Sequence, residues 1–285
     1  MNYIHCLNNI SAQGTDLLTS DYELTDNIEA AQGILVRSAG MLDMEFSENL
    51  LAIARAGAGV NNIPLERCAE EGIVVFNTPG ANANAVKELV LCGMLLASRG
   101  IVGGIEWCKE NAEDPAIGKT AEKAKKQFAG RGIKGKTLGV IGLGAIGKKV
   151  AQIATAFGCE VIYYSASGKK RSDEYRQVDL DTLLKESDIV SCHAPLNEKT
   201  YHLMDAEAFG KMKETALFIN VGRGPIVNEK DMAKALKKGK IAAAGLDVLE
   251  EEPMRKDNPL RKLEVGDRLL ITPHIAWAAV EVRTR

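Results

Sequence analysis

Short apolar runs alternate with helical patterns along almost the whole chain. An apolar run between turn signals is typical of a buried strand, whereas an apolar residue at every third or fourth position is typical of a helix. The turn Thr78-Pro79-Gly80 interrupts the pattern, and a long apolar helix is expected after it, over 83–98. Before that turn the pattern predicts strands at 3–7, 33–38, 50–57 and 72–78.

From Gly135 onward the alternation is more regular. One helix should begin at Asn228, where Asp231 completes the spacing of a capping box, and end near Gly239. We therefore expect an α/β fold with a doubly wound parallel sheet, which binds ligands at the carboxyl ends of its strands. The other helices are expected at 145–157, 180–186 and 205–212, and the strands at 137–142, 160–164, 188–194, 216–222, 242–248 and 269–273.

Composition narrows the class of protein. The 285 residues are 46% hydrophobic with a net charge of −2, so a sizeable core is possible and nothing global attracts nucleic acid or an anionic membrane. The basic run at 119–136 reads as a solvated helix face, with a phosphate-attracting patch as the alternative. The chain starts without a signal-peptide pattern, and its six cysteines show neither close pairing nor metal-ligand spacing. We expect a cytoplasmic protein without a metal site or membrane span.

The sequence GLGAIG at 142–147 follows a predicted strand and opens a predicted helix. Gly142 permits a tight turn, Gly144 keeps space clear for a pyrophosphate, and Gly147 lets helix and strand pack closely. The helix N-terminus would then present N–H groups to the phosphates. The context predicts a dinucleotide site, although a glycine turn needed only for packing has the same spacing.

The second strand of this unit ends without the acidic residue that usually binds the adenosine ribose. Ser165 stands there, and Lys169, Lys170 and Arg171 follow. A carboxylate would repel a 2′-phosphate, whereas a hydroxyl and nearby bases would accept one, so this segment favours NADP over NAD. A serine also fits the unphosphorylated ribose of NAD, and the bases can simply be solvated.

Three polar residues follow successive predicted strands beyond the glycine motif: Arg223, Glu252 and His274. An arginine can bind a substrate carboxylate, and a histidine can give a proton to a ketone oxygen as hydride arrives. A neighbouring glutamate favours the imidazolium form and orients the ring. The set suits reduction of a 2-keto acid. Separately, each has a structural explanation: a turn arginine, a solvated acidic run and a loop histidine.

Taken together, GLGAIG, NVGRG, GLDVLEEEP and TPHIAW, in this order, resemble the D-isomer-specific 2-hydroxyacid dehydrogenases over essentially the whole chain. The resemblance implies a Rossmann cofactor domain at 81–277, a smaller flavodoxin-like substrate domain at 1–80 and the start of a truncated return segment at 278–285. As partners it implies a small 2-hydroxy or 2-keto acid and a second copy of the chain in a homodimer, with no nucleic acid and no membrane.

The resemblance also assigns residues. Arg223 is the substrate-orienting arginine and His274 the proton donor, and the Glu-Pro pair chooses Glu252 among three successive glutamates, a choice that the residues alone leave open. Asp247 would hold the nicotinamide carboxamide. Arg37, Ser38, Ala58 and Gly59 would contact the substrate. The remaining cofactor positions are Gly142, Gly144, Ala145, Ile146, Gly147, Ser165, Ala194, Val221, Gly222 and Ala276.

The substrate is less defined than the reaction. Up to about residue 147 the chain resembles 3-phosphoglycerate dehydrogenases, and beyond it glycerate dehydrogenases, also called hydroxypyruvate reductases. We expect 3-phosphoglycerate, with glycerate, hydroxypyruvate or glyoxylate as the alternative. In this family a long helix after the histidine completes the smaller domain, so a chain ending at Arg285 is expected to leave apolar surface uncovered. A cofactor-sensing protein like the family's corepressor relatives is the alternative of another class.

Overall fold

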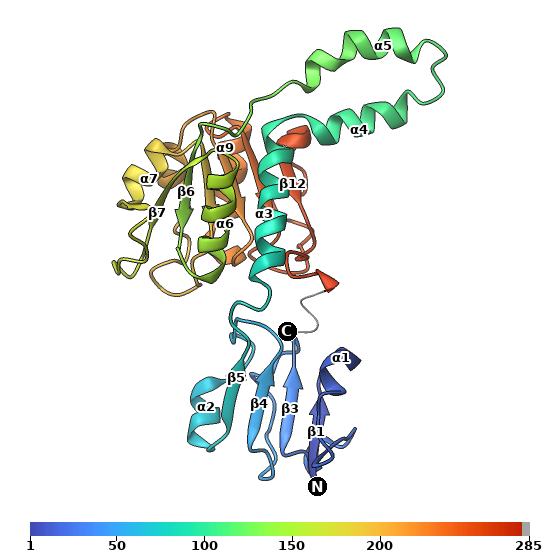
Figure 1. Ribbon diagram of the computed structural model, residues 1–285, viewed down its shortest axis with the longest axis vertical. Coiled ribbons are helices and arrows are strands. Elements are labelled where there is room, and N and C mark those ends of the chain that lie inside the picture. The colour runs from blue at the N-terminus through green and yellow to red at the C-terminus, as the bar shows by residue number, and fades with distance from the viewer. Residues whose placement is uncertain (281–285) are drawn as a thin grey trace. The chain divides into compact units, whose positions relative to one another are not determined.

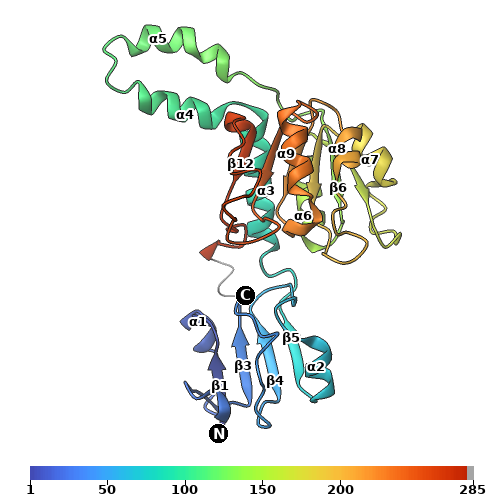
Figure 2. The same cartoon turned by 180° about the vertical axis from the view of Figure 1, so that it is seen from behind.

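The computed structural model describes residues 1–280, which form two compact units (Figures 1 and 2). One unit comprises Met1–Ala85 and the segment from Trp277, and the other comprises Val86–Ala276. Each contains a parallel sheet, as the alternation of strands and helices predicted. The functional assignment of the two parts stays a prediction.

The first unit is built on a five-stranded sheet in the order β2-β1-β3-β4-β5. This is the strand order of flavodoxin-like folds, and every strand pair in it is parallel. Four of the strands were predicted, but the short exposed strand β2 was not. The strands are β1 (Asn2–Cys6), β2 (Tyr22–Leu24), β3 (Gly33–Val36), β4 (Ala52–Arg55) and β5 (Val74–Asn77), with helices α1 (Ala12–Thr15) and α2 (Leu65–Glu70) and the 3₁₀ turn η1 (Ile28–Ala30) between them.

Strand β5 presents apolar side chains to solvent. Val74 and Phe76 are 53% and 58% exposed, while Val75, on the opposite face, packs against the core of the unit. Leu51, just before β4, is 61% exposed.

The second unit is built on a seven-stranded parallel sheet in the order β12-β11-β10-β9-β6-β7-β8. Strands β6 to β8 are added toward one edge of the sheet and β9 to β12 toward the other, so the boundary between the parallel strands β6 and β9 is the topological switch point of a doubly wound sheet. The six predicted strands are all present, and the two-residue strand β8 was missed. The seven strands are β6 (Thr137–Ile141), β7 (Glu160–Tyr164), β8 (Arg176–Gln177), β9 (Ile189–Cys192), β10 (Leu217–Asn220), β11 (Ala243–Leu246) and β12 (Leu269–Ile271).

Helices cover both faces of this sheet (Figures 1 and 2). The apolar side chains of α3 (Ala83–Ser98) and α6 (Ala145–Ala156) pack into one core cluster. Those of α7 (Leu180–Glu186), α8 (Ala206–Lys211) and α9 (Glu229–Lys237) pack into the other. Strands buried on both faces, such as β9 and β10, are therefore continuous apolar runs.

Two helices, α4 (Ile101–Glu110) and α5 (Ile117–Ala124), form an arm that extends from the body of this unit (Figure 1). The sequence pattern did not predict α4, whereas α5 includes the start of the basic run that was interpreted as a solvated helix face. The 3₁₀ turn η2 (Lys125–Phe128) returns the chain, and the Phe128 ring packs 6.3 Å from the ring of Trp107. Within residues 1–280 no single helix is long and apolar enough to cross a membrane. Helices α3 and α4 meet that test only together, across a 69° bend.

The predicted capping box at the start of α9 requires two reciprocal hydrogen bonds, and the structure contains one of them. The Asn228 side chain accepts from the Asp231 N–H at 3.1 Å, as expected. The reciprocal bond is replaced, because the Asn228 N–H donates to Met204 O at 3.0 Å and the Asp231 carboxylate accepts from Ala206 N–H at 3.2 Å. The start of α9 is thus hydrogen-bonded to Met204 and to Ala206, the first residue of α8.

Candidate active site

The glycine loop joins β6 to α6 and has the geometry that each glycine position requires. Gly142 has φ +94°, and a Cβ added there would lie 2.8 Å from Ala194 N. A Cβ on Gly147 would lie 2.2 Å from Gly142 O. A side chain at either position would therefore collide with backbone, which confirms the tight turn and the close helix–strand packing.

Gly144 is different, because a Cβ added there would meet no atom of the described residues within 4 Å. Its backbone is extended and caps the twelve-residue helix α6, whose first N–H groups have no intrahelical partners. The protein itself does not require a glycine here. An open space beside a helix N-terminus is what a pyrophosphate needs to approach the backbone, so the residues present fit a dinucleotide.

Substitution of Gly144 separates cofactor binding from folding. Because the added methyl group enters open space, Gly144→Ala should change the unfolding midpoint little. The same methyl group should obstruct the pyrophosphate and weaken NADPH binding about tenfold or more, equivalent to about 1.4 kcal/mol. Titration of cofactor fluorescence tests this, with Gly142→Ala as the contrasting variant that should lose stability. Unchanged cofactor affinity would count against the cradle.

Ser165 follows β7, where the ribose contact was predicted. It is 9% exposed, and its hydroxyl lies 3.1 Å from that of Ser167. Of the following bases, Lys170 forms an ion pair with Asp173, which raises the pKa of Lys170 and reduces its capacity to attract a phosphate. Arg171 lies within 3.5 Å of the Ser167 hydroxyl. The serines and Arg171 are thus the groups near the strand end that suit a 2′-phosphate.

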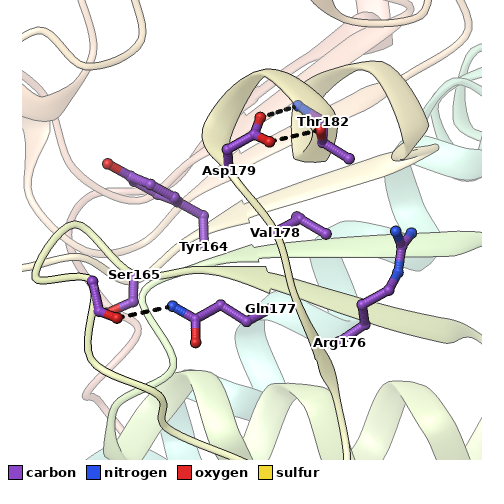
Figure 3. Close-up of a pocket in the computed structure, with 8 residues that line it drawn as sticks. Tyr164, Ser165, Arg176, Gln177, Val178, Asp179 and Thr182 are labelled. Atoms are coloured by element: carbon purple, nitrogen blue, oxygen red, sulfur yellow. Dashed lines mark hydrogen bonds between the residues drawn. The ribbon is translucent and has the colours of Figure 1, made fainter.

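A shallow pocket of about 540 Å³ lies beside this strand end (Figure 3). Its wall is held in place by Asp179, which accepts from both the N–H and the hydroxyl of Thr182 and so caps α7. The loop on the other side is tied by Gln177, which donates to Gly168 O at 3.3 Å. The pocket is lined by Tyr164, Ser165, Gly168, Arg176, Gln177, Val178, Asp179 and Thr182.

Arg223 follows β10 in a turn fixed by a buried side chain that the sequence did not single out. Asn220 is 0% exposed; it accepts from Gly222 N–H and donates to Arg223 O, both at 3.0 Å. The Arg223 guanidinium itself donates to Gly222 O at 2.7 Å. The only sequence signal for Asn220 is an amide at the end of an otherwise apolar strand.

The three successive glutamates have three different surroundings. Glu250 accepts from the Glu229 N–H at the start of α9, and Glu251 pairs with Arg255. Glu252 accepts from His274 Nδ1 at 2.7 Å, while its other oxygen accepts from Leu249 N–H. The contact with His274 agrees with the choice of Glu252, which the residues alone could not make.

His274 stands in a strained turn after β12, and Asp247 holds that turn. The backbone of His274 has φ +53°, a conformation that few residues other than glycine adopt. Asp247, 2% exposed, accepts from the Thr272 hydroxyl at 2.6 Å and from the N–H groups of Ile275 and Ala276 at 2.8 Å. Asp247 thus positions the histidine; its predicted contact with a nicotinamide stays a prediction.

The remaining predicted cofactor positions lie around the same strand ends. Ala194 packs against the glycine loop, and Val221 and Gly222 belong to the turn after β10. Ala145 and Ile146 open α6, and the N–H of Ala276 is bound to Asp247. Together with Gly144 they lie in the segments that directly follow β6, β9, β10 and β12, at the carboxyl edge of one sheet.

His193, after β9, has a ring that is largely enclosed. Its Nε2 lies 2.8 Å from the Ser191 hydroxyl, and its buried Nδ1 has no hydrogen-bond partner among residues 1–280. Burial lowers the pKa of His193 from 6.5 to about 4, so the ring is neutral near pH 7. It is therefore unsuited to donate a proton, in keeping with the sequence-based preference for His274.

The low pKa of His193 has a consequence for stability. Between pH 6.5 and 4 the unfolded chain takes up a proton on this ring that the folded chain does not. Stability should therefore fall as the pH falls through that window. Chemical denaturation at pH 7 and pH 5 should show this loss in the wild type and a smaller loss in His193→Gln. Equal losses in the two proteins would show that the ring is not buried as described.

The predicted substrate contacts of the first unit lie after β3 and β4. Arg37 and Ser38 have exposed side chains, while the N–H groups of Arg37, Ser38 and Ala39 all donate to Asn8 Oδ1 at 2.8 to 3.1 Å. The Arg37 guanidinium stacks on the Trp277 ring, 5.0 Å from its centroid. Ala58 and Gly59 follow β4, where Asn77 donates to Ala58 O at 2.7 Å.

Comparisons with known proteins agree with this site. The NAD-binding domain of the D-isomer-specific 2-hydroxyacid dehydrogenases matches residues 91–276. A hydroxypyruvate reductase of Thermotoga maritima is 41% identical over 92% of this chain and 83% of its own length. A D-3-phosphoglycerate dehydrogenase of Methanocaldococcus jannaschii is also 41% identical over 88% of this chain, which spans 47% of that relative.

The solved structures agree as well. The TT0316 protein of Thermus thermophilus superposes with a TM-score of 0.85, at 29% identity, over 100% of this chain and 93% of its own. The family match covers the glycine loop and the residues from Arg223 to His274. The chain belongs to the D-isomer-specific 2-hydroxyacid dehydrogenases, a family of NAD(P)-dependent oxidoreductases.

Proposed function

We propose that the chain catalyses reversible hydride transfer between a nicotinamide cofactor and a three-carbon 2-hydroxy acid, with 3-phosphoglycerate as its substrate. The observation that carries the reaction type is the 2.7 Å contact between His274 Nδ1 and Glu252, at the sheet edge that also holds the glycine loop. A bound nicotinamide would supply or accept the hydride.

The roles of the protein groups follow from this contact. Because Nδ1 faces the carboxylate, Nε2 is the ring nitrogen that we assign to proton transfer with the substrate oxygen. Glu252 accepts the hydrogen bond from Nδ1 and so orients the ring for proton transfer. Arg223 is assigned to the substrate carboxylate, because its planar fork can form two parallel hydrogen bonds to one carboxylate.

Arg37 supports the choice of a phosphorylated substrate. Its ring-stacked guanidinium is fixed by Trp277 across one face, which leaves the N–H edges to bind an anion. Hydroxypyruvate is the second candidate, because the Thermotoga relative, of which this chain spans 83%, carries the name of that activity.

A panel of 2-keto acids tested with NADH and NADPH decides between these substrates. We expect oxidation of the reduced cofactor with both 3-phosphohydroxypyruvate and hydroxypyruvate, with the larger kcat/KM for the phosphorylated acid. Arg37→Ala should reduce kcat/KM for the phosphorylated acid more than for hydroxypyruvate. A larger value for hydroxypyruvate, unchanged by Arg37→Ala, would favour the second candidate. A folded, cofactor-bound protein that turns over none of the acids would favour a sensing protein.

We also propose NADP as the preferred cofactor, and Ser165→Asp tests it. A carboxylate at this position would repel a 2′-phosphate and accept hydrogen bonds from the ribose of NAD. The ratio of kcat/KM for NADPH to that for NADH should fall by about tenfold or more, which corresponds to about 1.4 kcal/mol. Ser172→Asp, beyond the Ser165–Ser167 pair, is the control. An unchanged ratio in Ser165→Asp would contradict this cofactor choice.

A further inference from the structure

One buried carboxylate near the site has no role in the chemistry proposed above. Glu229, the first residue of α9, is 4% exposed. Its carboxylate accepts from Glu250 N–H at 2.7 Å and from Asn258 Nδ2 at 2.5 Å. Both donors belong to the loop after β11, and this is the loop that carries Glu252.

The attachment between α9 and this loop is reciprocal. The Glu229 N–H donates to Glu250 Oε1 at 2.8 Å, while the Glu250 N–H donates to the Glu229 carboxylate. The two segments also touch through their backbones, since a Cβ on Gly224 would lie 1.7 Å from Leu249 O. Residues 249–250 are thus clamped against the segment 224–229, which follows Arg223.

Two hydrogen bonds connect the clamped residues 249–250 to His274. Leu249, next to Glu250, donates its N–H to Glu252 Oε1 at 3.0 Å. The other oxygen of Glu252 accepts from His274 Nδ1. If the backbone at 249–250 shifts, the Glu252 carboxylate must shift with it.

Stability alone does not account for a carboxylate at position 229. Burial raises the pKa of Glu229, and the nearby charges of Glu250 and Glu252 raise it further. Burying a negative charge beside an acidic loop is unfavourable unless it is well hydrogen-bonded. The two hydrogen bonds to the loop oppose that cost, and their geometric effect is to fix the loop.

We propose that Glu229 is a positioning residue that acts through Glu252: it anchors the loop 249–252 so that the Glu252 carboxylate faces His274. The inference rests on the proposed function, in which that contact orients the proton donor. It assigns Glu229 no contact with substrate or cofactor.

Glu229→Ala tests the proposal, with Glu207→Ala as the matched control. Glu207 is likewise an acidic residue in the first turn of a helix of this unit, but it pairs with Lys211. Glu229→Ala should reduce kcat by about 10²-fold, as expected for a displaced catalytic group, with the Kd of NADPH within about threefold of wild type. Glu207→Ala should change neither. Glu229→Gln, which can still accept from Glu250 N–H, should recover part of the rate and serves if the alanine variant does not fold.

Two further readouts distinguish positioning from a general loss of structure. In a Glu252→Gln background, the Glu229 substitution should add less than about threefold to the loss of kcat, because both act through one contact. The tautomer of His274, read from its side-chain ¹⁵N shifts, should change from the Nδ1–H form to a mixture in the Glu229 variants. An additive loss of kcat, or an unchanged tautomer, would overturn the proposal. The tautomer measurement needs no turnover, so it separates failure of this inference from failure of the proposed function.

Discussion

His274→Ala is expected to lose turnover by on the order of 10²- to 10⁴-fold, the usual contribution of a general acid–base group. The substitution should lower kcat, because the imidazole gives its proton only as the ketone oxygen gains charge. The side chain is 47% exposed and lies outside both core clusters of its unit, so the unfolding midpoint should hardly change. Stopped-flow measurement of the reaction with saturating reduced cofactor and keto acid checks the rate.

The control for this variant is cofactor affinity. His274→Ala should bind NADPH about as tightly as the wild type, because the glycine loop and α6 are untouched. His5→Ala, which removes a histidine of β1 whose Nδ1 contacts Thr25 O in the other unit, should keep normal turnover. Loss of cofactor binding in His274→Ala, or turnover near the wild-type rate, would show that its assigned role is wrong.

Asp247→Ala should have the largest effect on stability, together with a loss of activity. The substitution leaves the N–H groups of Ile275 and Ala276 without their acceptor, while the Thr272 hydroxyl keeps its 3.4 Å contact with Leu246 O. At about 1 kcal/mol or more for each N–H left without an acceptor, the free energy of unfolding should fall by about 2 kcal/mol or more. For a unit of this size that corresponds to a fall in Tm of roughly 4 to 8 °C. Because the same donors hold the turn of His274, turnover should fall as well.

Asp181→Ala is the matched control for this prediction. Asp181 is also a carboxylate with a hydrogen-bonded partner, Lys211, but its side chain is 52% exposed. Removing an exposed ion pair should change stability by less than about 1 kcal/mol. A Tm of Asp247→Ala equal to that of Asp181→Ala would mean that the turn after β12 does not depend on the carboxylate.

The sheets and most helices could be predicted because their signals are local. A short window of sequence is enough to predict the apolar runs that become β9 and β10 and the sixteen-residue helix α3. Strands β2 and β8 were not predicted because they are short and lie at sheet edges, where no buried face requires a pattern of apolar residues. Helices α4 and α5 of the arm contain no buried residue. Their sequences therefore lack the apolar face that marks a helix packed against a core.

In the site, the sequence indicated the groups that would do chemistry but not those that hold them. Arg223 and His274 could be selected because polar residues after buried strands are unusual. Asn220, Glu229 and the turn-holding role of Asp247 could not, because each depends on partners that only the fold brings near. Glu229 and Asn258, for instance, are 29 residues apart in the chain. Such tertiary hydrogen bonds leave no periodic trace in a single sequence.

Isotope transfer tests the proposed reaction most directly. The wild-type chain would be supplied with a 2-keto acid and a reduced nicotinamide cofactor carrying two deuterium atoms at C4 of its ring. The account predicts a 2-hydroxy acid with one deuterium at C2, formed by the wild type and scarcely by His274→Ala. A 2-hydroxy acid without deuterium, or none at all from the folded, cofactor-bound chain, would contradict it.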